Sequence, residues 1–232
     1  GKPIHWSEEG VRNFWRWFGS SRVVDAQGRP LVVYHGTGAD IAVFSKPTKG
    51  KLTSHLLDFG FHFGGPEVAN TYASLAQYGG RLQSDMSRDA KQGDPAVYPA
   101  YLSAPKVVDL TDGNTLPAEL RESVLALAEM NGMTKRSKFV QLVDADPVGL
   151  LAVLQRKAGR GAIKKLFQDA GYSGIRYSFD GVSFVVFNPN QIKSSTGNTG
   201  SFSPDDPDIR FNLATDWYNG PSGAPVRNAW QR

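Results

Sequence analysis

Three groups of residues in this 232-residue chain have the types and spacing to bind a ligand or act on it. The first is Tyr34-His35-Gly36-Thr37, which ends the apolar run of residues 31–34, a pattern typical of a buried strand. A histidine beside a glycine places a ring nitrogen next to backbone that a ligand can approach closely, which suits an amide and a ribose hydroxyl. The alternative, which spacing alone favours, is a core histidine hydrogen-bonded to backbone.

The second group is residues 59–65, where glycines alternate with aromatic residues around His62. Tyr72 follows ten residues later, on a segment whose Pro66 predicts a helix over residues 66–77. Glycines between aromatics predict a narrow strand, against which a planar ligand has room to lie. The alternative is an edge strand with core phenylalanines. The strand residues that would line such a site are Gly60, Phe61, His62 and Phe63.

The third group lies near the end of the chain. Ile175 opens a predicted strand, Asp180-Gly181 predicts a turn, and the segment from Ser183 to Lys193 reads SFVVFNPNQIK. Taken alone, this pattern predicts a hairpin in the core sheet, whatever its function.

Several kinds of site are disfavoured by what the sequence lacks. The spacing of His35, His55 and His62 matches no zinc motif, so we expect no metal. No phosphate-binding loop, nucleophile elbow or dinucleotide fingerprint is present in the sequence. The chain contains no cysteine, which excludes disulfides and a cysteine nucleophile.

Length and composition indicate a globular chain of one or two domains, and the order of the predicted helices and strands indicates the α+β class. The net charge of +4 is too mild to indicate nucleic-acid binding, and its basic clusters are interpreted as solvated surface. No apolar run approaches the ~20 residues of a membrane span, so we expect no membrane association. Helices are predicted over residues 8–18, 66–77, 116–130, 148–157 and 161–170, with short strands dispersed around them. Residues 39–54 and 79–95 are expected to be loops.

After Gln191 the composition changes, and the segment that follows is rich in Ser, Gly, Asn and Asp. We therefore expect one domain over residues 1–193 and an extended tail over residues 194–232, partly docked or disordered. The apolar residues expected to dock it are Ile209, Phe211, Trp217 and Trp230.

In this order, the three groups resemble the motifs of the ADP-ribosyltransferase superfamily, and most closely its domains in phage and mobile-element polyvalent proteins. The start, VVDAQGRPLVVYHGT at residues 23–37, and the end, NPNQIKSSTGNTGSF followed by PDIRF, both match. The resemblance spans residues 14–211. It implies a split β-sheet core with flanking helices, and NAD⁺ as co-substrate.

The resemblance also implies roles for individual residues. His35 would hydrogen-bond a ribose hydroxyl of NAD⁺, and Gly36 would clamp the nicotinamide amide, with Tyr34 and Thr37 alongside. Tyr72 would stack on the nicotinamide ring. His62 stands where related polymerases carry tyrosine.

The chain departs from the family at its usual catalytic glutamate, where it carries Ser183. A serine hydroxyl has no charge to stabilise the cation that develops at the anomeric carbon. The candidate substitutes are Asp180 in the turn and Gln191 after the strand.

Three functions remain open at this point. The first is mono-ADP-ribosylation of a macromolecular acceptor, protein or nucleic acid, in the cytoplasm, or in the host cytoplasm for a phage-delivered effector. The second is an NAD-binding module without turnover, and the third is a structural or interaction segment of a polyvalent protein. The oligomeric state is left open. Residues 39–54 and 79–95 are the candidate donor and substrate loops.

Overall fold

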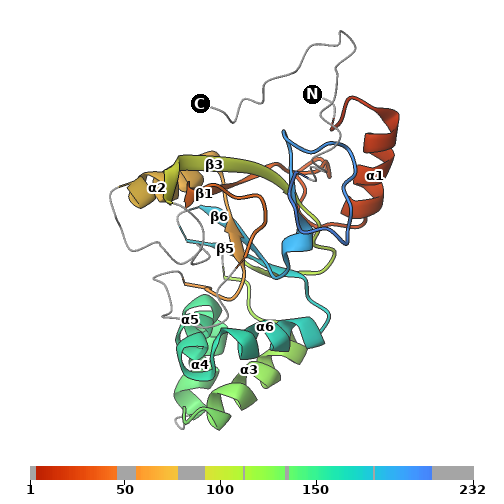
Figure 1. The fold of residues 1–232 in the computed structure, drawn as a ribbon. Helices are drawn as coiled ribbons and strands as arrows, with labels where there is room; N and C mark the ends of the chain where they lie inside the picture. The colour runs from red at the N-terminus through yellow and green to blue at the C-terminus, as the bar shows by residue number, and fades with distance from the viewer. Residues whose placement is uncertain are drawn as a thin grey trace.

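Two β-sheets form the centre of the computed structural model, which describes residues 4–45, 56–77, 92–111, 113–133, 136–179 and 181–210 (Figure 1). The three-stranded sheet has the order β1-β3-β7 and is antiparallel, with strands β1 (Val33–Ala39), β3 (Gln92–Leu102) and β7 (Ile192–Ser194). The four-stranded sheet has the order β2-β6-β5-β4, with strands β2 (Phe61–Phe63), β6 (Val182–Val186), β5 (Gly174–Ser178) and β4 (Val107–Leu110). Only β4 and β5 run parallel within it.

The two sheets are joined where Tyr34 and Gly64 exchange backbone hydrogen bonds of 2.9 Å. Phe61, Phe63 and Phe184 from the four-stranded sheet pack against residues of the other sheet, including Val33 and Ala100. Strand residues point alternately to opposite faces, so this inter-sheet cluster uses every second position of β2 and β6. The expectations of an α+β chain and of a core divided between two sheets are confirmed.

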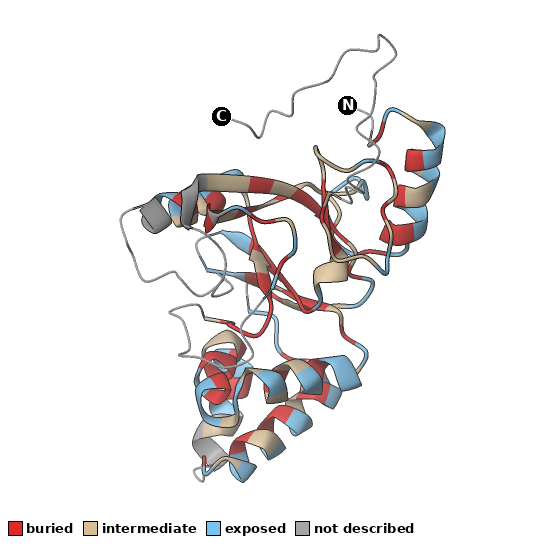
Figure 2. Cartoon of the chain, viewed as in Figure 1, coloured by how far each residue is buried: buried red, intermediate tan, exposed pale blue. Residues whose placement is uncertain are grey.

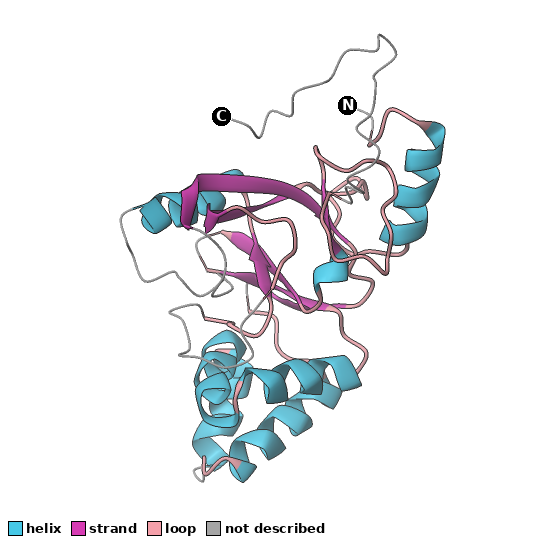
Figure 3. Cartoon of the chain, viewed as in Figure 1, coloured by secondary structure: helices cyan, strands magenta, loops and turns pink. Residues whose placement is uncertain are grey.

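Four helices cover the opposite face of the four-stranded sheet (Figure 3). They are α3 (Ala118–Met130), α4 (Arg136–Ala145), α5 (Pro147–Ala158) and α6 (Arg160–Asp169). Helix α5 begins where Asp146 accepts a hydrogen bond from the Gly149 amide and ends at Gly159, whose φ is 90°. Buried and exposed segments alternate along these helices, as expected for amphipathic helices packed on a sheet (Figure 2).

The remaining helices are α1 (Glu8–Phe18) and α2 (Pro66–Gln77). Ser7 caps α1, which buries Phe14, Trp17 and Phe18 against Tyr101 and Phe202. Helix α2 packs on β1 and β3. None of the helices in the described part of the chain has the length and apolar character that crossing a membrane needs.

The sequence pattern missed α4 and the full length of β3. Helix α4 contains Val140 and Val143, whose branched side chains lower helix propensity, so packing of the fully buried Val143 decides its conformation. Strand β3 begins at Gln92, inside the predicted loop of residues 79–95. It pairs with β7 only over residues 100–102, so its first part is an edge that tolerates Pro95.

The segment after β7 packs into the domain through Phe202 and Ile209, each 2% exposed. The Ser194 amide donates to the Ile209 carbonyl, and the Ile209 amide donates to the Ala42 carbonyl, both at 2.9 Å. Residues 194–210 are thus docked on the core, and Ile209 is one of the apolar residues that were expected to dock them. Phe211, Trp217 and Trp230 lie outside the described residues.

Candidate functional site

His35 lies in the middle of β1 with its ring directed between the sheets. Its Nδ1 donates to the His62 carbonyl at 2.8 Å, so in the neutral ring Nε2 is the nitrogen that accepts. Phe44 meets the ring edge-on with centroids 4.9 Å apart, and Phe63 lies 5.5 Å away. The side chain is 4% exposed. This burial has the features of a core histidine, and a ligand reaches Nε2 only if the covering rings move.

The strand alternation of β1 divides the first group between two faces. His35 and Thr37 are buried on the inter-sheet side, whereas Gly36 faces α2. A Cβ at Gly36 would overlap the Ala69 carbonyl of α2. The close approach that this glycine permits is therefore to a helix. Tyr34 lies on the same face of β1 as Gly36. It is half-buried, and its backbone joins the two sheets.

His62 and its neighbours mainly hold β2 in place. The His62 Nε2 donates to the Leu57 carbonyl at 2.6 Å, and Nδ1 accepts from the Tyr177 hydroxyl at 3.1 Å. A Cβ at Gly60 would overlap Val185 of β6, so this glycine lets two chain segments touch. The buried side chains of Phe61 and Phe63 fill the inter-sheet cluster. The second group is therefore largely structural, and the expected planar-ligand surface at these positions is occupied by protein.

Ser183 is buried at the start of β6 and pairs with Tyr177 of β5. Its Oγ lies 3.3 Å from the point that a Cβ on Gly64 would occupy, and Val68 of α2 lies 3.2 Å from the same point. Val68 is also 3.6 Å from the Cβ position of Gly181, where φ is 113°. The first turn of α2, the end of β2 and the β5–β6 turn therefore meet at Ser183.

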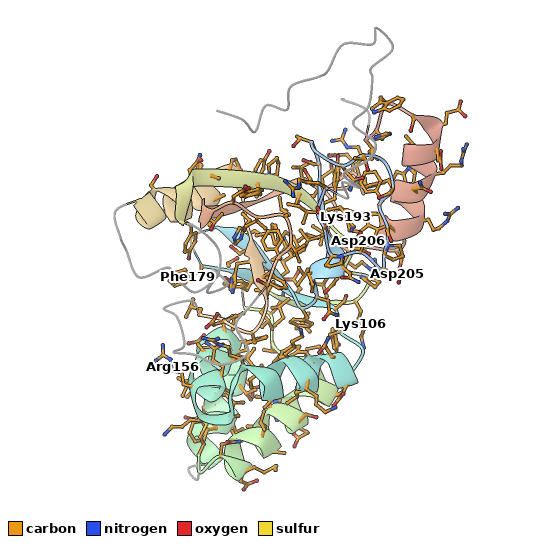
Figure 4. All side chains as sticks on the ribbon, viewed as in Figure 1. Lys106, Arg156, Phe179, Lys193, Asp205 and Asp206 are labelled. Atoms are coloured by element: carbon orange, nitrogen blue, oxygen red, sulfur yellow. The ribbon has the colours of Figure 1, made fainter. Side chains whose placement is uncertain are left out.

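Tyr72 follows Val68 by four residues on α2, so the two side chains share one side of the helix. Tyr72 is half-buried, and it lies one turn beyond the point where α2 meets Ser183. Phe179, on the β5–β6 turn, is 63% exposed (Figure 4). Ser183 and the helix that carries Tyr72 thus meet at Gly64, and backbone hydrogen bonds join Gly64 to Tyr34, the neighbour of His35. Asp180 lies outside the described residues.

Gln191 has a structural role, contrary to the expectation of a substitute catalytic group. Its Oε1 accepts from the Phe187 and Asn188 amides at 3.0 and 2.8 Å. Its Nε2 donates to the Ser103 and Ser173 carbonyls, each at 2.9 Å. These four bonds use all the donors and acceptors of the amide and hold the turn between β6 and β7.

This region offers some of the groups that nucleotide recognition uses. Tyr72 supplies a planar ring, and His35 supplies an acceptor nitrogen with a fixed tautomer. Ser183 supplies a hydroxyl but no charge, so this position has no carboxylate to stabilise a cation. Nor does the described part of the chain bring three histidine, aspartate or glutamate side chains together in a metal-binding group. His55 is outside it.

Sequence reasoning did not single out Gly64, Val68 or Tyr177. The alternation of β5 places Tyr177 on the same face as Ile175, toward the helices. The sequence pattern of this strand could have predicted that placement. Contact between Val68 and the β5–β6 turn depends on how α2 crosses β1, which no local pattern encodes.

Comparison with known proteins agrees with the order of the motifs. A family model described as "ADP-Ribosyltransferase in polyvalent proteins" matches residues 25–202, most of the chain. No curated protein matches. One solved structure, titled "Crystal structure of an anti-CRISPR protein", matches with 13% identity and a TM-score of 0.37, covering 70% of this chain and 91% of that chain. A likeness this low carries no argument about fold or function. The match to the family model shows that the chain belongs to the ADP-ribosyltransferases of polyvalent proteins.

Proposed function

We propose that this chain transfers ADP-ribose from NAD⁺ to a macromolecular acceptor and releases nicotinamide. Family membership supports the reaction class. The structural observation that carries the proposal is the meeting of Ser183, Gly64 and Val68, with Tyr72 one helical turn away. The family's aromatic and catalytic positions, 111 residues apart in sequence, are thus linked through Val68 of α2 and Gly64, which supports the proposal.

In this proposal the chain's residues bind and orient the dinucleotide. Tyr72 stacks on the nicotinamide ring and holds its plane while the glycosidic bond lengthens. His35 accepts a hydrogen bond from a ribose hydroxyl at Nε2, and its bond to the His62 carbonyl keeps the ring in the accepting tautomer. Because Phe44 covers this ring, the loop of residues 40–45 moves when the ribose binds.

The bond balance is that of a glycosyl transfer. The C–N bond between the ribose and nicotinamide breaks, and its electron pair leaves with neutral nicotinamide. A nucleophile of the acceptor forms the new bond to the anomeric carbon and gives up its proton to solvent or a nearby base. Ser183 polarises the ribose hydroxyl weakly, so we expect slow turnover unless Asp180 supplies the missing charge.

The second candidate is an NAD-binding module without turnover. Ser183 favours it, because loss of the glutamate removes the main charge-stabilising group of the reaction. A structural or interaction segment of a polyvalent protein is the third candidate. For all three we place the chain in the cytoplasm, that of the host where a phage delivers it.

One incubation separates these candidates. Adenine-labelled NAD⁺ is added to the protein with protein, DNA or RNA acceptors in separate reactions, and bound label, cleaved NAD⁺ and free nicotinamide are measured. The enzyme labels one acceptor class and releases nicotinamide. The binding module retains NAD⁺ uncleaved. Absence of both binding and labelling would contradict the proposal and leave the structural role, with salt-dependent nucleic-acid retention as its sign.

A further inference from the structure

Lys193 is a buried ammonium group that the proposed reaction does not use. It lies in β7 opposite Tyr101, and its side chain is fully buried. Its Nζ donates to the backbone carbonyls of Asp206 at 2.5 Å and Asp208 at 3.1 Å (Figure 4). Burial lowers the pKa of Lys193, while the carboxylates of Asp206 and Asp208 act in the opposite direction. An apolar side chain of the same volume would avoid the desolvation penalty but could not bond these two carbonyls, so holding them is a task for the ammonium.

That task is to hold residues 204–210, which we call the strap. The strap contains two turns closed by its own carboxylates. Asp206 Oδ1 accepts from the Asp208 amide at 2.8 Å, and Asp208 Oδ1 accepts from the Arg210 amide at 2.7 Å. Lys193 binds the carbonyls of both aspartates, and thus fixes the strap at the two points where its direction changes.

The strap in turn holds the loop of residues 40–45, which we call the Phe44 loop. The Ile209 amide donates to the Ala42 carbonyl at 2.9 Å, and Asp208 pairs with Val43 in an isolated bridge. The buried side chains of Ile41, Phe44 and Ile209 belong to one apolar cluster. The loop is also held by Tyr98, whose hydroxyl accepts from the Ile41 amide at 2.9 Å and donates to Asp40 at 3.1 Å.

The Phe44 loop ends on the ring of His35. Phe44 is 4% exposed and meets His35 edge-on, so the loop and the strap together close the inter-sheet side of β1. Phe63 also borders the ring, but it is fixed in β2. Phe44 is therefore the cover that can move without disturbing a sheet.

We propose that Lys193 is a latch: through the strap it holds the Phe44 loop closed over His35, and release of the strap opens that face of β1. Where it concerns NAD⁺, this proposal rests on the proposed function. If only open molecules bind NAD⁺, the apparent affinity is the intrinsic affinity multiplied by the fraction of molecules that are open. Weakening the latch raises that fraction and therefore strengthens NAD⁺ binding.

The first test does not use NAD⁺. In Lys193→Met, which keeps the length of the side chain and removes its charge, we expect amide exchange in residues 40–45 and 204–210 to accelerate at least about tenfold. Carbethoxylation of His35 by diethyl pyrocarbonate, followed by peptide mass spectrometry, should accelerate in parallel. Exchange in α3 and α6 should not change. Lys165→Met, which removes an exposed charge paired with Asp169, is the matched control and should change neither readout.

The second test measures coupling. Lys193→Met should lower the dissociation constant for NAD⁺ several-fold, and in a Phe44→Ala background it should have no further effect, because the cover is already absent. A merely structural role for Lys193 would give additive effects. If Lys193→Met does not fold, Asp206→Ala replaces it, since it removes the acceptor of the Asp208 amide from a partly exposed site and should show the same changes to a smaller degree.

Unchanged exchange and His35 reactivity in folded Lys193→Met and Asp206→Ala would overturn the latch. Faster exchange with a weakened or additive NAD⁺ response would overturn it as well. If the wild-type chain and Phe44→Ala both bind no NAD⁺, the proposed function fails, while the exchange and modification rates still decide whether Lys193 closes the loop.

Discussion

The Nδ1 of His35 donates to the backbone carbonyl of His62 across 2.8 Å, and this bond links the central part of β1 to β2 of the other sheet. One contact therefore serves two purposes. It satisfies a buried carbonyl where the two sheets meet, and it fixes which nitrogen of His35 carries the proton. His35 can therefore both link the two sheets and accept a hydrogen bond from a ligand. Variants that keep one of these roles and remove the other distinguish them.

The two roles of His35 should separate in His35→Asn and His35→Ala. The Asn side chain can place a donor near the Nδ1 position, so we expect the smaller loss in the free energy of unfolding, about 1 kcal/mol. His35→Ala leaves the His62 carbonyl unsatisfied and opens a cavity, which costs about 2–4 kcal/mol. Both variants should lose at least tenfold in NAD⁺ affinity, roughly 1.4 kcal/mol. Denaturant unfolding and calorimetric titration measure these quantities. Wild-type affinity in folded His35→Asn would remove the histidine from the site.

Gly36→Ala should disturb the packing of α2 on β1. The added methyl group would overlap the Ala69 carbonyl, so the helix must shift, at an expected cost of more than about 2 kcal/mol. Gly161→Ala in α6 is the matched control, because nothing beyond its chain neighbours and the backbone of its own helix lies within 4 Å of the added Cβ, and alanine favours a helix by up to about 1 kcal/mol. Thermal unfolding measures both. Equal stability of the two variants would mean that α2 does not lie on Gly36.

Ser183→Glu tests the position where the chain departs from its family. We expect nicotinamide release to rise at least about tenfold, because a carboxylate at this position would stabilise the developing cation. Ser183→Gln has nearly the same shape without the charge and should stay near the wild-type rate. Since Ser183 is buried beside Gly64, the folding of each variant is checked by circular dichroism. Equal rates in the two variants would show that the charge comes from elsewhere.

The sequence predicts an element of this fold well where interactions between residues close in sequence determine it, and poorly where contacts between distant segments do. Helices α1 and α2 were predicted well, because caps, prolines and apolar periods act within a few residues. The first part of β3, residues 92–95, was missed, because pairing of β3 with β1 outweighs the poor strand propensity of these residues.

The candidate site was predicted less fully. The motifs placed His35, Tyr72 and Ser183 in one functional group, and the structure links them through α2 and Gly64. The structural roles of Gly36 and Gln191 depend on which side chains and backbone groups surround them, and no spacing rule states that. Lys193 was part of a recognised motif, but its burial follows from the return of the strap over β7.

Acid should destabilise the fold in part through Asp109. Burial raises the pKa of this carboxyl. The hydrogen bonds from Thr111 and the ion pair with Arg176 outweigh the effect of burial, so the pKa of Asp109 lies below its usual 3.8. The unfolded chain then binds the proton first, and the stabilisation is present above the unfolded pKa and lost as the pH falls through the folded one.

We therefore expect Asp109→Asn to be less stable than the wild type at neutral pH, by under about 1 kcal/mol since the pair is half-exposed. The difference should shrink between pH ~5 and ~2. Denaturant unfolding at several pH values measures it. A difference that stays constant with pH would show that the Asp109 carboxyl has no depressed pKa.

The most direct measurement of the central claim is the stoichiometry of NAD⁺ cleavage. With the acceptor class that becomes labelled, nicotinamide release is followed by NMR while adenine label on the acceptor is counted in the same samples. We expect one nicotinamide released per label transferred, with both quantities reduced together in Tyr72→Ala. Release of no nicotinamide above the buffer rate, with intact NAD⁺ recovered from every reaction, would contradict it.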